Sequence, residues 1–248
     1  MTVQSEASVR NASITAGVGL LLMSVLAGFG NFFAVVGLVT QRDAAQTAKD
    51  ITASEGMFRF GIVSLLLVIA LDVVIALALY RVFSPVNKSI SLLAAALRLV
   101  YAGVFLVAIG QLLGVLRLLS TDGYLSVFSA DQLHAQALLQ INAFTDLWHA
   151  GLLLFGLHLL VIGYLAYRSG YVPRVLGVLL AIAGLGYVID SFGVVLSQGT
   201  WTDVSSFTFL GEFLLALWLV IWGRRITLTE PGRTTKDPAV ARSGAEPL

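Results

Sequence analysis

The chain has 248 residues, of which 58% are hydrophobic and 12% are charged, with a net charge of +1 and a mean hydropathy of +0.90. Soluble domains carry roughly 25% charged residues, so this composition excludes an ordinary soluble domain. The small net charge and the dispersed basic residues argue against a nucleic-acid partner. Cysteine is absent, which excludes disulfides, thiolate metal sites and cysteine nucleophiles.

Long apolar stretches follow one another along the whole chain. The first begins after Arg10 and is far longer than the roughly 7–15-residue apolar core of a cleaved signal peptide, so we predict a retained span. About 20 apolar residues are enough to cross a bilayer. The sequence therefore predicts an all-α, polytopic membrane protein, a bundle of six transmembrane helices at 12–39, 57–80, 89–118, 147–167, 173–196 and 206–223.

Two of the connections are short turns that contain Pro85 and Pro173. The longest one, between the third and fourth spans, includes Ser129-Ala130-Asp131-Gln132, which has the pattern of a capping box. Apolar residues then recur at helical spacing, and we predict a short interfacial helix that leads into the fourth span. These residues are Leu133, Ala137, Ile141 and Phe144. We expect another short helix at Ala44–Ala53.

The distribution of Lys and Arg predicts the orientation, because cytoplasmic segments of membrane proteins are enriched in both. One side would hold Arg10, Arg81, Lys88, Arg168, Arg174, Arg224, Arg225, Arg233, Lys236 and Arg242, and the other Arg42, Lys49, Arg59 and Arg117. Both termini are therefore predicted to be cytoplasmic. The expected organisation is an N-terminal tail at 1–11, a transmembrane domain at 12–225 and a disordered tail at 226–248.

Glycines recur along one face of several spans, where small residues let membrane helices approach closely. We expect packing faces at Gly103, Gly110 and Gly114 in the third span, Gly156 and Gly163 in the fourth, and Gly177 and Gly184 in the fifth.

Asp72 and Arg98 are charged residues inside the second and third spans, and both are equally far in sequence from Pro85. An antiparallel hairpin therefore places them at the same depth, near the middle of the bilayer. An isolated ion there costs several kcal/mol, so they should pair or face a wet cavity. The pair could be static and join two helices. It could also be an anion site, where Arg98 binds a carboxylate or phosphate and Asp72 holds Arg98 in the empty state.

His158 and Glu212 are predicted at a similar depth. Each has a structural interpretation, as a packed histidine or a protonated, hydrogen-bonded glutamate. Each also has a functional one, as an acid–base group or a proton carrier. With Asp72 and Arg98 they form the midplane cluster, our candidate for ligand binding or proton relay.

Asp146, His149 and Asp190 are predicted to lie nearer the outer surface. Asp146 and His149 share a helical face, and Asp190 lies level with them across the next hairpin. They could form a hydrogen-bond network or the site of an enzyme. A metal needs more ligands than can be identified here, so no metal is assigned. The chain lacks a lysine within its spans and the motifs of nucleotide or hydrolase sites, so we assign no cofactor and no catalytic residues.

Several segments resemble a bacterial membrane-protein family described only as a domain of unknown function, number 4386. They are Ala53–Ile62, Asp72–Tyr80, Pro85–Asn87, Arg98–Ala102, Phe155–Gly170, Pro173–Arg174, Ile189–Phe192 and Gly211–Glu212. The resemblance implies a multi-pass, six-helix protein of the bacterial inner membrane. It implies no activity and no site residues.

Taken together, the sequence favours a protein that binds or transports a small amphiphilic or anionic ligand through the midplane cluster, with membrane lipid as a partner. One alternative is an intramembrane enzyme, with or without the assistance of a metal, that uses the outer-face residues. Another is a structural subunit whose buried ions only join helices. The oligomeric state does not follow from the sequence.

Overall fold

The computed structural model describes residues 6–120, 123–197, 201, 204 and 210–226. Within these ranges the protein is all α-helical and contains no strand, as predicted. The helices are α1 (Glu6–Gly28), α2 (Ala44–Ala53), α3 (Glu55–Phe83), α4 (Lys88–Leu118), α5 (Ala130–Arg168), α6 (Arg174–Leu196) and α8 (Leu210–Ile221). A π-helical turn at Phe29–Phe33 and a 3-10 turn at Val36–Leu38 extend α1, and a 3-10 turn at Gly223–Arg225 follows α8.

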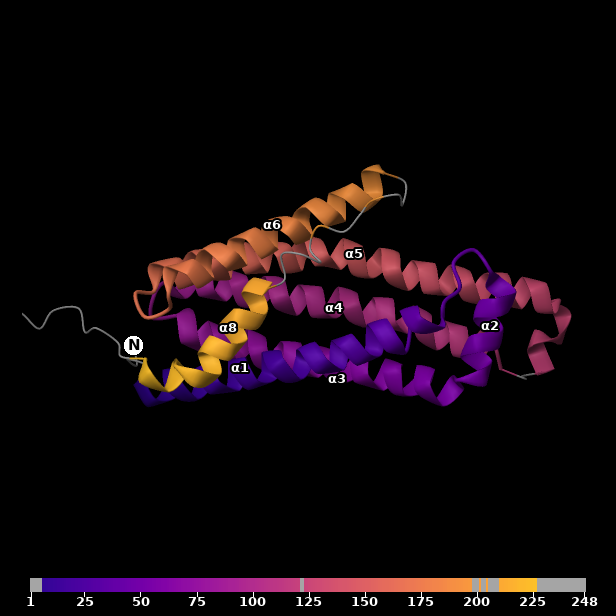
Figure 1. The fold of residues 1–248 in the computed structure, drawn as a ribbon, viewed down its shortest axis with the longest axis horizontal. Coiled ribbons are helices and arrows are strands. Elements are labelled where there is room, and N and C mark those ends of the chain that lie inside the picture. Colours follow the sequence, from indigo (N-terminus) through magenta and orange to yellow (C-terminus); the bar gives the residue numbers. More distant parts are fainter. Residues whose placement is uncertain (1–5, 121–122, 198–200, 202–203, 205–209, 227–248) are drawn as a thin grey trace, which may run out of the picture.

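The long helices run side by side along the length of the molecule (Figure 1), and their contacts form a closed ring. In chain order α1 packs on α3, α3 on α4, α4 on α5 and α5 on α6, and α8 contacts both α6 and α1 to close the ring. The start of α1 and the end of α8 lie at the same end of the bundle, where Arg10 Nε donates to the carbonyl of Ile226 at 3.0 Å. The opposite end carries α2, which packs mainly against α5.

Five helical segments are long and apolar enough to cross a membrane. They are Glu6–Leu38, α3, α4, α5 and α6. The sixth predicted span corresponds to α8, whose 12 residues are fewer than the roughly 20 needed for a full crossing. Residues 205–209, which precede α8, lie outside the described residues.

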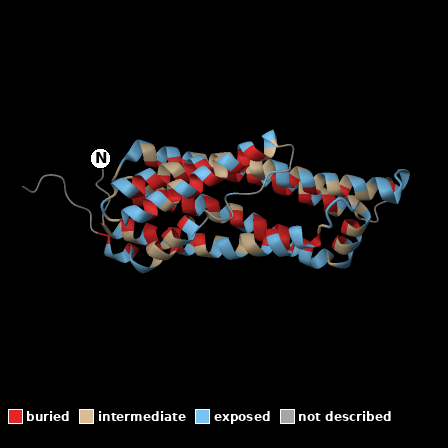
Figure 2. Cartoon of the chain, turned by 45° about the horizontal axis from the view of Figure 1, so that its top comes forward, coloured by how far each residue is buried: buried red, intermediate tan, exposed pale blue. Residues whose placement is uncertain are grey.

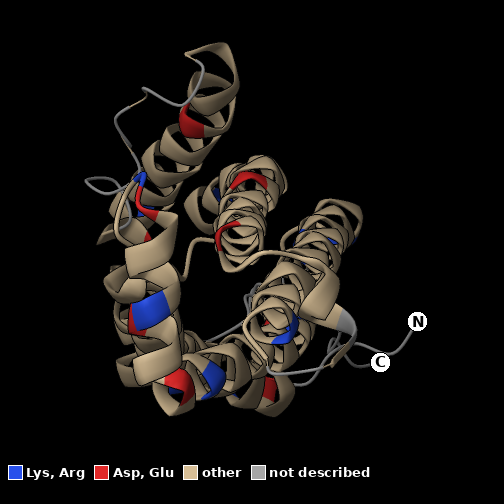
Figure 3. Cartoon of the chain, turned by 90° about the vertical axis from the view of Figure 1, so that its right-hand side faces the viewer, with Lys and Arg blue, Asp and Glu red and all other residues tan. Residues whose placement is uncertain are grey.

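The outward faces of the helices are apolar. Phe60, Val107 and Val195 are 70%, 59% and 74% exposed, whereas buried residues face the neighbouring helices (Figure 2). Viewed along the bundle, most of each helix carries no charged residue (Figure 3). An apolar outer surface of this extent is unfavourable in water and suits a hydrocarbon environment.

The predicted helix that leads into the fourth span is present, but it is not a short element of the loop. The capping box at Ser129 and Gln132 is confirmed, and it begins one continuous helix of 39 residues that includes the fourth span. Ala137, Ile141 and Phe144 are buried against the rest of the bundle. Because these residues continue the packed face of α5, the helix continues through residue 147 without a break.

The predicted short helix at Ala44–Ala53 is confirmed as α2, and the Asp43 side chain caps it by accepting from the Gln46 amide at 2.9 Å. At the N-terminus α1 already begins at Glu6, so much of the predicted N-terminal tail is helical. The predicted disordered tail lies outside the described residues from position 227 onward.

The predicted glycine faces are right for two helices, and in α4 only for Gly114, which lies against the Gln140 side chain of α5. A Cβ atom on Gly156 would lie 2.7 Å from the Gly184 carbonyl oxygen, and one on Gly163 equally close to that of Gly177, so α5 and α6 touch through their backbones. Around Gly103 and Gly110 there is open space instead. α4 is rotated so that these two glycines face outward, which spacing along one helix does not reveal.

Candidate functional site

Asp72 and Arg98 form the predicted ion pair across the α3–α4 hairpin. Arg98 Nε donates to Asp72 Oδ1 at 2.8 Å, and Nη2 lies 2.7 Å from the same oxygen. Both side chains are 1% exposed. The turn between the helices fixes their register, because Asn87 caps α4 by accepting from the Ile90 amide at 3.0 Å.

His158 of α5 joins this pair as a neutral ring. Its Nδ1 lies 2.8 Å from the Ala94 carbonyl, which can only accept, so Nδ1 carries the proton. Its Nε2 lies 3.3 Å from Arg98 Nη1 and accepts from it. His158 therefore orients the Arg98 guanidinium through Nε2. The Ala94 carbonyl of α4, which accepts from Nδ1, fixes the tautomer of the histidine.

Two further side chains enclose Arg98. Nη2 lies 3.5 Å from the sulfur of Met23 in α1, and the guanidinium carbon lies 5.3 Å from the ring centroid of Phe155 in α5. A desolvated cation over an aromatic face is favourable by about 2 kcal/mol. Phe155 lies one helical turn before His158, which is a weak signal in the sequence, and no pattern in the sequence indicates Met23.

Glu212 of α8 completes the cluster from the opposite side of the ring. It interacts electrostatically with Arg98 and Asp72, and the Tyr187 side chain of α6 is its hydrogen-bond partner. The structure therefore brings all four predicted residues of the midplane cluster together. With Met23 and Tyr187 included, every helix of the ring contributes a side chain.

The cluster contains more hydrogen-bond acceptors than its present contacts use. Asp72 Oδ2 and Glu212 Oε1 are both buried, and neither has a hydrogen-bond partner among the described residues. Leaving a buried polar atom unsatisfied costs about 1–3 kcal/mol. Such atoms usually mark a place where water, a proton or a ligand is bound.

The three outer-face candidates differ in their contacts. Asp190 Oδ1 accepts from Trp201 Nε1 at 2.9 Å and from the Val204 amide at 2.8 Å, so it anchors the connection between α6 and α8. Asp146 is exposed. The His149 carbonyl accepts from Ser191 Oγ at 2.9 Å. Among the described residues no three His, Asp or Glu side chains are placed to hold a metal ion.

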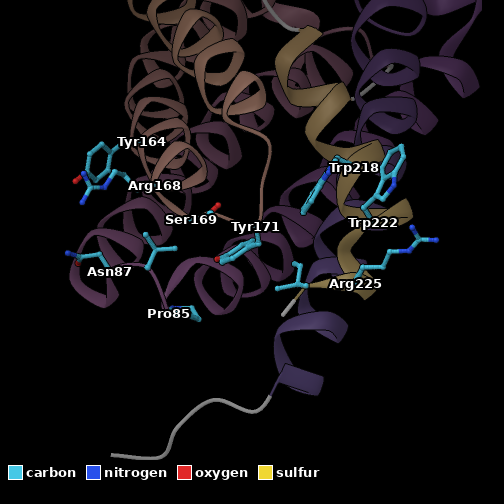
Figure 4. Close-up of a pocket in the computed structure, with 12 residues that line it drawn as sticks. Pro85, Asn87, Tyr164, Arg168, Ser169, Tyr171, Trp218, Trp222 and Arg225 are labelled. Carbon is cyan, nitrogen blue, oxygen red and sulfur yellow. The ribbon is translucent and has the colours of Figure 1, made fainter. Parts of the chain in front are cut away.

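A cavity of about 780 Å³ opens at the end of the bundle where α1 begins and α8 ends (Figure 4). We call it the end pocket. The end pocket was not predicted from the sequence, although both proline-containing turns and the arginines beside them are evident there. Its lining residues are Pro85, Val86, Asn87, Tyr164, Arg168, Ser169, Gly170, Tyr171, Trp218, Trp222, Arg225 and Ile226.

Comparison with known proteins agrees with the sequence resemblance. Residues 15–223 match the family described as "Domain of unknown function (DUF4386)". The chain belongs to this family. The DUF4386 match runs from α1 to the end of α8 and includes the whole midplane cluster.

A relative in Archaeoglobus fulgidus, described as an uncharacterized protein, is 36% identical over 168 residues, which cover 68% of this chain and 86% of the relative. This relative is archaeal, so the bacterial origin implied by the resemblance stays a prediction. No solved structure matches the chain.

Proposed function

We propose that this protein crosses the membrane six times, with α8 in the sixth crossing and both termini in the cytoplasm. The apolar outer surface supports membrane residence. An even number of crossings agrees with the proximity of Arg10 and Ile226 at one end. That end carries most of the basic residues of the described chain, which supports a cytoplasmic location, and the bacterial inner membrane remains the proposed site.

We further propose that it binds or transports a small anionic or amphiphilic ligand through the midplane cluster. The observation that carries this proposal is the way Asp72 holds Arg98. Both contacting nitrogens of Arg98 share the single oxygen Oδ1, and the second oxygen has no hydrogen-bond partner in the part of the chain that the structure describes. A carboxylate that makes two parallel bonds would hold the guanidinium more strongly. A ligand carboxylate or phosphate can therefore replace Asp72 at Arg98.

A purely structural pair would explain the short distances equally well, because breaking a buried ion pair by removing one partner destabilises a protein strongly. It does not explain why two buried carboxylate oxygens remain unsatisfied in a cluster to which the whole ring contributes. An anion site in which Asp72 holds Arg98 until a ligand replaces it accounts for both features.

The absence of cysteine makes a direct test possible. Met23 contacts Arg98, so a Met23→Cys variant places a single thiol beside the guanidinium. The probe is a small anionic methanethiosulfonate, applied to the protein in sealed vesicles. We expect Asp72→Asn, added to Met23→Cys, to raise the modification rate roughly 10-fold, because Arg98 is then free to attract the anion.

A cationic methanethiosulfonate of similar size should show no such acceleration. Val107→Cys is the matched control, since Val107 is exposed on the outer apolar surface and its thiol should stay unreactive toward both reagents. If Met23→Cys is equally unreactive with and without Asp72→Asn, in protein that remains folded, the cluster is a static pair and the proposal fails.

A further inference from the structure

We infer that the end pocket binds the phosphate-bearing headgroup of an anionic amphiphile at the membrane surface. This inference rests on the membrane placement proposed above but does not require the midplane cluster to bind anything. It concerns a separate set of residues, from the α3–α4 turn, the end of α5, the α5–α6 turn and the end of α8.

The walls of the pocket are fixed by contacts within the protein. The Tyr171 hydroxyl donates to the Val82 carbonyl at 2.5 Å, and its ring stacks on Phe83 with centroids 6.5 Å apart. Gly170, at φ +73°, provides the left-handed backbone that this turn requires. On the other side Arg10 holds the Ile226 carbonyl. The pocket is therefore preformed, which reduces the entropic cost of binding.

The pocket carries positive charge that no acidic side chain of the described residues pairs with. Arg168 and Arg225 are exposed and lie on opposite sides of it (Figure 4). In the described part of the chain neither of them forms a salt bridge, and Glu6, an acid at this end, is paired with Arg10 at 3.2 Å. Arginine binds phosphate through two parallel hydrogen bonds and is less strongly hydrated than lysine.

The aromatic side chains indicate an amphiphile rather than a free ion. Tyr164, Tyr171, Trp218 and Trp222 line the pocket, and Trp and Tyr favour the level of the lipid headgroups. A volume of about 780 Å³ is far larger than an inorganic phosphate needs and lies within the range of about 300–1,000 Å³ typical of organic ligands. Basic pockets between transmembrane helices on the cytoplasmic side are known to bind lipid headgroups.

The test uses the full-length protein in detergent and a short-chain, water-soluble phosphatidylglycerol as the probe, with quenching of tryptophan fluorescence as the signal. The variant Arg168→Gln with Arg225→Gln removes both pocket charges. We expect it to lower the affinity by at least roughly 10-fold, because each charge-assisted hydrogen bond to phosphate is strong.

The matched control is Arg174→Gln with Arg224→Gln. These arginines carry the same charge at the same end but do not line the pocket, and the guanidinium carbon of Arg174 instead lies 5.5 Å from the centroid of the Tyr167 ring. We expect the affinity of this control variant for the lipid to stay within roughly 2-fold of that of the parent protein, since long-range surface charge is largely screened by salt. Equal losses in the two double variants would mean surface attraction only and would overturn the inference.

Two further ligands separate the sources of the phosphate group. A short-chain phosphatidylcholine, which has no net charge, should bind more weakly than phosphatidylglycerol. Inorganic phosphate should not compete at comparable concentration, and if it binds as tightly as the lipid, the amphiphile is the wrong ligand. Because the probe reports on the end pocket, a negative result for Met23→Cys would leave this inference standing, and the reverse also holds.

Discussion

Arg98 is 1% exposed, yet its guanidinium contacts Asp72, His158, Met23 and Phe155 from three other helices. An arginine held this way is desolvated at limited cost, because charge, hydrogen bonds and an aromatic face replace water. The desolvation of Asp190 is compensated differently, because one of its oxygens accepts from two donors of the α6–α8 connection. The two buried acids thus have different roles. Asp72 belongs to the midplane cluster, whereas Asp190 anchors the α6–α8 connection.

The anchoring role of Asp190 predicts a graded loss of stability. Asp190→Ala leaves the Trp201 and Val204 donors without an acceptor and should lower the free energy of unfolding by about 1–3 kcal/mol. Asp190→Asn keeps an acceptor oxygen and should cost less. Unfolding in detergent, followed by tryptophan fluorescence, measures both. Asp146→Ala is the control, since that side chain is exposed, and an equal loss for Asn and Ala would contradict the anchoring role.

At the scale of helices, α5 and α6 pack closely through small residues. Gly156 faces Gly184, and Gly163 faces Gly177, so the two backbones touch at two levels. In lipid no hydrophobic effect drives helices together, and dispersion contacts at such short range are what holds them. This hairpin carries His158 and Phe155, so its packing also sets the position of the Arg98 site.

Filling one of these contacts should disrupt the hairpin. Gly156→Leu puts a side chain where the Gly184 carbonyl now lies, and overpacking of this kind costs about 1–3 kcal/mol or more. Gly103→Leu is the matched control, because a side chain there enters open space. Its stability should change by no more than about 0.5 kcal/mol, as for other surface substitutions. Thermal unfolding of both variants in the same detergent gives the comparison, and equal losses would refute the packing argument.

For the molecule as a whole, the ring brings the two described ends of the chain to one side. α8 contacts α1 and α6, and Ser13 Oγ donates to the Leu219 carbonyl at 3.2 Å. The basic residues of the two proline-containing turns are at this end as well, together with the end pocket. Charge asymmetry and ring closure therefore favour the same orientation.

Labelling of single cysteines should confirm that orientation. In intact cells we expect an impermeant maleimide to label Lys49→Cys, in α2, and to label Lys88→Cys only after the membrane is permeabilised. Both lysines are exposed in the structure, so reactivity depends on the side of the membrane. Labelling of both from outside would contradict the proposed bundle, and the reverse pattern would contradict the proposed orientation.

Local rules were sufficient for much of this protein. Composition and segment length predicted the apolar helices, the capping box predicted the start of α5, and the equal distance of Asp72 and Arg98 from Pro85 predicted their pairing. Each of these depends on residues close in sequence or joined by one short turn, where helix geometry alone determines depth. The same reasoning put Asp190 near His149 but could not say what its carboxylate binds.

The rotation of each helix and the choice of its neighbours depended on the tertiary structure. Packing around the ring decided that Met23 and Phe155 enclose Arg98, that Gly103 and Gly110 face outward, and that α5 continues through the predicted interfacial segment. It also joined two turns and the end of α8 into the end pocket. A pattern along one helix records depth and periodicity, whereas which face meets which neighbour is set by contacts between residues far apart in the chain.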